Sequence, residues 1–244
     1  MGKRFDRAQG FSCLTKRPAT KSDSIRTVVS KQKIDSSQEE SPDSSVDTAH
    51  YIRDYLATLS MLLAAVDVGA VTRAIDLLEA AYQDDRRLVL CGNGGSGTTA
   101  SHLVCDLMKG ILLEGPHNKP FEVIALNDSS ALLSAWANDT EFAEVFAGQA
   151  RTWLRAGDVL LVISGSGNSP NILQVVEAAR ERGAVSIGFC GYDGGRLASR
   201  VDLALVVEKR NMQQVEDIHL ALGHILFSAL RDRIKGLLAN QETT

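Results

Sequence analysis

The sequence has few cysteines and no long apolar run. Its four cysteines, Cys13, Cys91, Cys105 and Cys190, are scattered and form no CxxC pair, which is the usage of a reducing cytoplasm. No apolar run reaches the roughly 18 residues that a membrane-spanning helix needs. The basic N-terminus has no apolar segment behind it, so a secretory signal is not expected either. We therefore expect a cytoplasmic protein that does not engage a membrane.

Positive charge is scarce outside the first residues. Residues 1–34 hold nine Lys or Arg against two Asp, a net charge of +7, and since the whole chain has −4, the remainder carries about −11. A nucleic-acid-binding face is normally rich in Lys and Arg. The charge distribution thus argues against nucleic-acid binding by the folded core.

Nucleotide-binding signatures are also missing. The chain contains no GKS or GKT lysine, which excludes a P-loop. The segment GNGGSG, residues 92–97, matches GxGxxG formally, but no acidic ribose ligand follows a second strand at about 20 residues. A sugar phosphate, held by hydroxyls and backbone N–H groups, suits this sequence better than a dinucleotide.

Two stretches share one pattern of strand, polar loop and helix. LVLCGNGGSGTTASH, residues 88–102, places a glycine-rich turn between an apolar strand and a helix, and DVLLVISGSGNS, residues 158–169, does the same before a helix that starts near Pro170. Glycines let the backbone approach a ligand, and a helix start offers free N–H groups to an anion. The pair predicts two sides of one pocket.

Segment order predicts an α/β fold. Residues 1–46 are polar and are expected to be a disordered tail, with one domain over residues 47–240. Apolar residues at helical spacing predict two N-terminal helices that form an antiparallel hairpin, for which another subunit is one candidate partner. Alternating strands and helices then predict a three-layer sandwich around a five-stranded parallel sheet. The expected strands are 88–91, 121–126, 159–163, 185–189 and 203–207, and the last helix spans about 214–238.

Titratable residues gather on two predicted helices. His102 and Asp106 share a face at i and i+4, directly after the glycine loop, while Glu216, His219 and His224 lie on the last helix. Such a set can coordinate a divalent metal or divide acid and base roles. A single helical histidine more often makes only a structural hydrogen bond, so both readings stay open at this point.

Three motifs, GNGGSGTTASH, ISGSGNSPNI and VEDIHLALGHIL, resemble in order and spacing the SIS (sugar isomerase) domain and, within it, the phosphoheptose isomerases. The resemblance covers roughly residues 48–236. It implies a flavodoxin-like or Rossmann-like SIS fold, a homotetramer with active sites at subunit interfaces, and heptose biosynthesis. It also implies interconversion of sedoheptulose 7-phosphate and D-glycero-D-manno-heptose 7-phosphate by enediol proton transfer.

The resemblance also implies residue roles. Asp106 and His224 would be the acid/base pair, and a divalent metal, expected to be zinc, would be held by His102, Asp106, Glu216 and His224. Substrate would be bound by Asn93, Gly94, Gly95, Ser96, Asn138, Asp139, Ser164, Ser166, Ser169 and Glu216.

The chain departs from the family's pattern at three of its positions, with Asp106 for a glutamate, Glu216 for a glutamine and Gly165 for a threonine. Asp106 reaches about one methylene less far, and Glu216 adds a negative charge that should favour a cation. Two alternatives remain open. One is a non-catalytic SIS scaffold that binds a phosphosugar or a replication initiator, and the other is an isomerase of a different phosphosugar.

Overall fold

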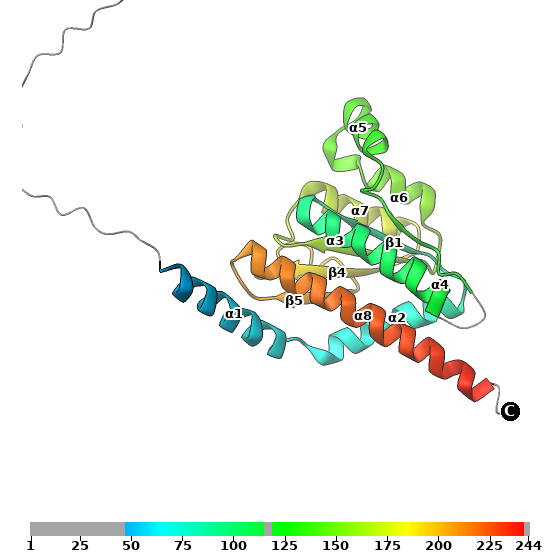
Figure 1. Ribbon diagram of the computed structural model, residues 1–244. Helices are drawn as coiled ribbons and strands as arrows, with labels where there is room; N and C mark the ends of the chain where they lie inside the picture. Colours follow the sequence, from blue (N-terminus) through cyan, green and yellow to red (C-terminus); the bar gives the residue numbers. More distant parts are fainter. Residues whose placement is uncertain (1–46, 115–118, 242–244) are drawn as a thin grey trace, which may run out of the picture. The chain divides into compact units, whose positions relative to one another are not determined.

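The computed structural model of the chain describes residues 47–114 and 119–241 (Figure 1). The predicted tail, residues 1–46, lies outside the described residues, as does Cys13. The described part contains one parallel sheet with helices on both faces. The predicted α/β class is therefore confirmed.

Five parallel strands form the sheet, in the order β2-β1-β3-β4-β5. Their bounds are β1 Leu88–Gly92, β2 Val123–Ala125, β3 Val159–Ser164, β4 Val185–Gly191 and β5 Leu203–Val207. Every residue of β1 and β3 is buried, because a parallel sheet is covered on both faces and its strands become continuous apolar runs. Each strand lies where the sequence predicts one.

The helices form two layers. In chain order they are α1 Thr48–Ala64, α2 Val68–Gln83, α3 Gly94–Val104, the π-helix η1 Cys105–Gly110, α4 Ile111–Glu114, α5 Ser130–Asp139, the 3-10 helix η3 Phe142–Glu144, α6 Ala147–Trp153, α7 Pro170–Glu181 and α8 Met212–Gln241. On one face of the sheet Leu88 and Leu90 join a core with α2, α3 and α8. On the other face Val89 and Cys91 join a core with α6 and α7. Successive strand residues thus feed opposite layers, which confirms the three-layer sandwich.

The two N-terminal helices are present, but they do not fold back on each other. Residues 65–67 join α1 to α2, and the axes bend by 66° at this break. Asp67 already caps α2, since its carboxylate accepts a hydrogen bond from the N–H of Ala70 at 2.9 Å. The second helix therefore begins directly after the break, and the pair is bent and not antiparallel. As a result α1 has no buried residue, although it exposes Ile52, Leu56 and Met61.

Among the described residues, no single helix has both the length and the apolar character of a membrane span, whereas α1 and α2 taken together meet those criteria as a bent pair.

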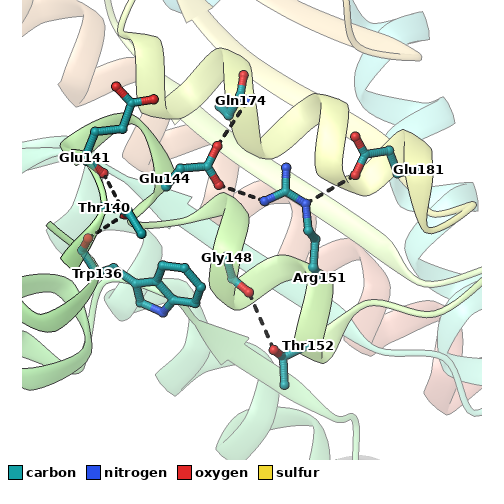
Figure 2. A network of polar contacts seen from close by, with 9 residues as sticks. All are labelled: Trp136, Thr140, Glu141, Glu144, Gly148, Arg151, Thr152, Gln174 and Glu181. Atoms are coloured by element: carbon teal, nitrogen blue, oxygen red, sulfur yellow. Dashed lines mark hydrogen bonds and ion pairs between the residues drawn. The ribbon is translucent and has the colours of Figure 1, made fainter.

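A polar network fixes the helices that follow β2 (Figure 2). Glu144 in η3 accepts hydrogen bonds from Arg151 at 2.7 Å and from Gln174 of α7 at 3.1 Å, and Arg151 also reaches Glu181 at 3.2 Å. Hydrogen bonding by Arg151 is the main cause that lowers the pKa of Glu144. The network ties η3 and α6 to α7, and α5 projects from this base (Figure 1).

Candidate active site

A cavity of about 290 Å³ opens beyond the carboxyl ends of β1 and β3, where ligands bind in open parallel sheets. The two polar loops of the sequence form its walls, and the first turn of α8 closes it. Its lining contains Asn93, Gly94, Gly95, Ser96, Ser164, Ser166, Ser169 and Glu216, together with Ile163, Gly165 and Met212. The structure thus brings together eight of the ten residues predicted to bind substrate.

The first wall depends on glycine. Gly94 has φ +52°, a left-handed conformation that side chains with a Cβ rarely adopt. At Gly95 an added Cβ would lie 2.5 Å from Oε1 of Glu216. Glycine at position 94 is therefore favoured by the turn into α3, and glycine at position 95 leaves the room that the Glu216 carboxylate occupies.

The second wall presents hydroxyl groups in a fixed arrangement. Oγ of Ser164 accepts a hydrogen bond from the N–H of Gly167 at 3.1 Å, and Oγ of Ser166 accepts one from the N–H of Asn168 at 3.3 Å. Because each oxygen accepts within the loop, its O–H proton remains available to a ligand. Ser169 precedes α7 without capping it, and that helix start adds N–H groups and a favourable dipole for an anion.

Charge in the cavity comes from a carboxylate. Among the described residues, no Lys or Arg lines it, and Glu216 is its charged lining residue. An anionic ligand must consequently be held by neutral donors. The Glu216 carboxylate beside α3 disfavours a phosphate at that wall and leaves the serine loop as the better place for one.

A cluster of three titratable groups lies farther along α3 and α8. Nε2 of His102 is 2.9 Å from Nε2 of His224, and Oδ2 of Asp106 is 3.3 Å from the first and 3.8 Å from the second. The side chains come from α3, α8 and η1, and each histidine is about half exposed. The three groups are open to solvent and to a substrate.

The spacing of this triad matches a zinc site. Ligands at about 2.0–2.1 Å from a tetrahedral metal stand roughly 3.3 Å apart, close to the three separations observed here. Two imidazoles and one carboxylate leave a fourth position open, which is the arrangement of a catalytic rather than a structural site. The residues present therefore fit a divalent metal.

Glu216 lies outside this triad. The helices α3 and α8 run side by side in the same direction, since Gly95 meets Glu216 and, further along, Leu103 meets Gly223. The eight residues from Glu216 to His224 advance about 12 Å along the helix. Cavity and triad are thus two neighbouring groups along the α3/α8 contact.

Asn138 and Asp139 do not line the cavity. They end α5, are exposed, and bond to each other, with Nδ2 of Asn138 donating to Oδ1 of Asp139 at 2.8 Å. Within one copy of the chain the structure does not bring these two residues to the predicted site.

His219 proves to be a core residue. It is fully buried, its Nε2–H donates to the carbonyl of Cys190 at 3.1 Å, and its Nδ1 has no partner among the described residues. Burial lowers its pKa to about 4. The apolar spacing of Val215, Ile218 and Leu222 was the available signal, because it places position 219 on the buried face of α8.

Sequence reasoning also missed Asn171, in the first turn of α7. It is 1% exposed and pairs with Asn93 across the two walls of the cavity. No local pattern could have revealed the pair, because the two residues are 78 positions apart.

Comparison with known proteins gives the family. Residues 50–191 match the SIS domain. The phosphoheptose isomerase of Rhodospirillum rubrum is 36% identical over 165 residues, which are 68% of this chain and 86% of the relative. The chain belongs to the phosphoheptose isomerase family of SIS-domain proteins.

Two further members of the family are similar to this chain in sequence or in structure. The phosphoheptose isomerase of Nitratidesulfovibrio vulgaris is 39% identical over 141 residues, which are 58% of this chain and 66% of that relative. The solved structure of a phosphoheptose isomerase from Francisella tularensis has a TM-score of 0.70 at 28% identity, and covers 75% of this chain and 96% of that one.

The SIS match includes both walls of the cavity as well as His102 and Asp106, whereas Glu216 and His224 lie beyond residue 191. For His224 the argument is therefore geometric, since α8 brings its imidazole to His102 and Asp106.

Proposed function

We propose that the protein is an aldose–ketose isomerase that interconverts sedoheptulose 7-phosphate and D-glycero-D-manno-heptose 7-phosphate. One observation carries the proposal: a pocket of neutral donors and a His102–Asp106–His224 triad follow each other along the α3/α8 contact in a member of this family. The extended chain of a heptose phosphate suits a site whose two functional groups are separated along one helix pair.

Substrate binding uses the serine loop for the phosphate. Ser164, Ser166 and Ser169 supply hydroxyls, and the start of α7 supplies N–H groups. The opposite wall, with Asn93 and Glu216, suits hydroxyl groups of the sugar, because a carboxylate accepts hydrogen bonds from O–H groups but repels phosphate. This polarity orients the carbonyl end of the sugar away from the serine loop.

The reaction moves protons between two neighbouring carbons. A base removes one proton from C1 of the ketose, a proton returns to C2, and O2 gains a proton as O1 loses one, so that the enediol collapses to the aldose. Asp106 would carry these protons, whereas His224, whose Nε2 lies 3.8 Å from Oδ2 of Asp106, would act by holding the cation, because a metal on Nε2 occupies the lone pair that a proton needs. Their mutual distance lets both groups face one enediol.

His102, Asp106 and His224 would hold a divalent metal, which we propose to be zinc. When bound, such a cation polarises the substrate carbonyl and stabilises the developing oxyanion. Asp106 would then bind the cation through one carboxylate oxygen and carry the proton on the other, and its short side chain keeps the carboxylate beside the two imidazoles.

Assembly into a homotetramer in the cytoplasm completes the proposal. Ile52, Leu56 and Met61 on α1 and Val68 at the start of α2 are exposed, and such apolar surface is usually covered by another subunit. In the tetramer, Asn138 and Asp139 at the end of α5 would reach the pocket of a neighbouring copy. This accounts for their distance from the cavity of their own chain.

Substitution of Asp106 and His224 tests the catalytic assignment. We expect Asp106→Asn and His224→Ala each to lower kcat with sedoheptulose 7-phosphate at least about 100-fold, because the first removes the proton carrier and the second removes a ligand of the metal. Calorimetry should show that both variants still bind inorganic phosphate, whose site lies at the serine loop.

The matched control is Asp232→Asn, which removes an exposed carboxylate paired with Arg231 at 3.0 Å and should leave kcat unchanged. Wild-type activity retained by both site variants would falsify the assignment. The rival view of a non-catalytic scaffold requires a wild-type protein without turnover.

A further inference from the structure

Two asparagines form a reciprocal amide pair between the walls of the cavity. Nδ2 of Asn93 donates to Oδ1 of Asn171 at 3.0 Å, and Nδ2 of Asn171 donates to Oδ1 of Asn93 at 2.8 Å. Asn93 lines the cavity at the end of β1, while Asn171 is 1% exposed. The pair joins the glycine loop to the helix that follows the serine loop.

The surroundings of Asn171 are apolar. Its neighbours Ile172, Val175 and Val176 on α7 are buried in the core between the sheet and the layer of α6 and α7. A buried amide is costly unless it is hydrogen-bonded, and here the partner is another side-chain amide. The pair consumes one donor and one acceptor of Asn93, which keeps one N–H and one lone pair for a ligand.

Asn93 makes this pair in place of a hydrogen bond that would cap the start of α3. It is the residue directly before α3, where an asparagine side chain ordinarily accepts a hydrogen bond from the first turn of the helix. Its side chain makes no such capping bond. The N–H groups at the start of α3, beside Gly94 and Gly95, therefore stay open to the cavity instead of being covered by their own cap.

We propose that Asn171 is a positioning residue of the active site, which holds the Asn93 amide in the cavity and away from the start of α3. Asn171 does not touch the substrate; it acts through Asn93. The inference rests on the proposed function in one respect, namely that the cavity takes the sugar phosphate.

A crystal structure of Asn171→Ala tests the positioning directly. Without its partner, the Asn93 side chain should leave its present orientation, and its Oδ1 should accept a hydrogen bond from an N–H of the first turn of α3. An unchanged Asn93 orientation in this variant would overturn the inference. The structure decides the point even if the wild-type protein binds no sedoheptulose 7-phosphate, a result that would refute the proposed function instead.

The kinetics of single and double variants test whether Asn171 affects substrate binding through Asn93. Asn171→Ala and Asn93→Ala should each raise KM for sedoheptulose 7-phosphate about tenfold, the effect of one lost hydrogen bond. The double variant should show no higher KM than Asn93→Ala alone, because Asn171 has nothing left to position. Multiplying effects would indicate two independent roles and contradict the proposal.

Gln149→Ala is the matched control for a lost buried amide. Gln149 is 5% exposed and donates to the carbonyls of Leu126 and Val145 at 3.0 and 2.7 Å, on α6 and outside the cavity lining. We expect this variant to lower Tm while KM stays at the wild-type value. An equal rise in KM would mean that any loosening of the core has the same effect, and would overturn the role of Asn171.

Discussion

Among the described histidines, His219 is the one that is buried. Its Nε2–H donates to the carbonyl of Cys190, and a second proton, on Nδ1, would have no acceptor among the described residues. Burial therefore lowers its pKa from 6.5 to about 4. Well above pH 6.5 the imidazole is neutral in both folded and unfolded chains, and there the residue has no effect on the pH dependence of stability.

Acid should destabilise the fold through this residue. As pH falls from 6.5 to 4 the unfolded chain takes up a proton that the folded chain refuses, so the free energy of unfolding drops by about 3 kcal/mol. Urea unfolding of the wild type and of His219→Gln, whose amide keeps a donor for Cys190, checks this. The variant should lose less stability over that range, and parallel curves for the two proteins would contradict the explanation.

The position of the projecting helix α5 depends on its packing against α6 and on the polar network that joins η3 and α6 to α7. Trp136 of α5 packs on Gly148 of α6, where an added Cβ would lie 2.5 Å from the indole ring. Next to that contact, Glu144 and Arg151 connect η3 and α6 to α7 (Figure 2). A rigid ring over a glycine tolerates no added volume.

Gly148→Ala should thus lower the free energy of unfolding by about 1–3 kcal/mol, the usual cost of overpacking. Gly236→Ala is the matched control, because nothing lies within 4 Å of the added Cβ in α8. There, alanine's higher helix propensity should stabilise by up to about 1 kcal/mol. The midpoints of denaturant unfolding of the two variants and the wild type check this prediction. A Gly148→Ala protein as stable as the wild type would show that Trp136 can move without cost.

The sequence predicted helices and strands correctly where a local pattern of apolar residues or a proline determines the element. The apolar runs from Leu88 and Val159 and the proline at 170 gave two strands and a helix in their observed places. It did not give the π-helix Cys105–Gly110 or the open angle between α1 and α2. These features depend on backbone hydrogen bonding and on packing against α8, which leave no periodic signal.

For the whole molecule, topology explains why the cavity walls could be predicted. Adjacent parallel strands end at the same edge, so the loops after β1 and β3 had to meet. The approach of α8 to α3 was not foreseeable from local pattern, and it decides that His224 joins His102 and Asp106 while Glu216 joins the cavity. The apolar spacing of α8 could have placed His219 on its buried face, whereas the pairing of Asn171 with Asn93 became visible only in the structure.

The central claim is that the triad holds a divalent metal that serves isomerisation. The most direct measurement pairs metal analysis of the purified protein with its isomerase activity on sedoheptulose 7-phosphate before chelation, after chelation and after return of zinc. We predict one bound metal per chain. Chelation should abolish activity and lower Tm, and added zinc should restore both. The variant His102→Ala should bind no metal, and neither chelation nor zinc should change its Tm. Full activity in metal-free protein, or no turnover by the zinc-loaded enzyme, would contradict the account.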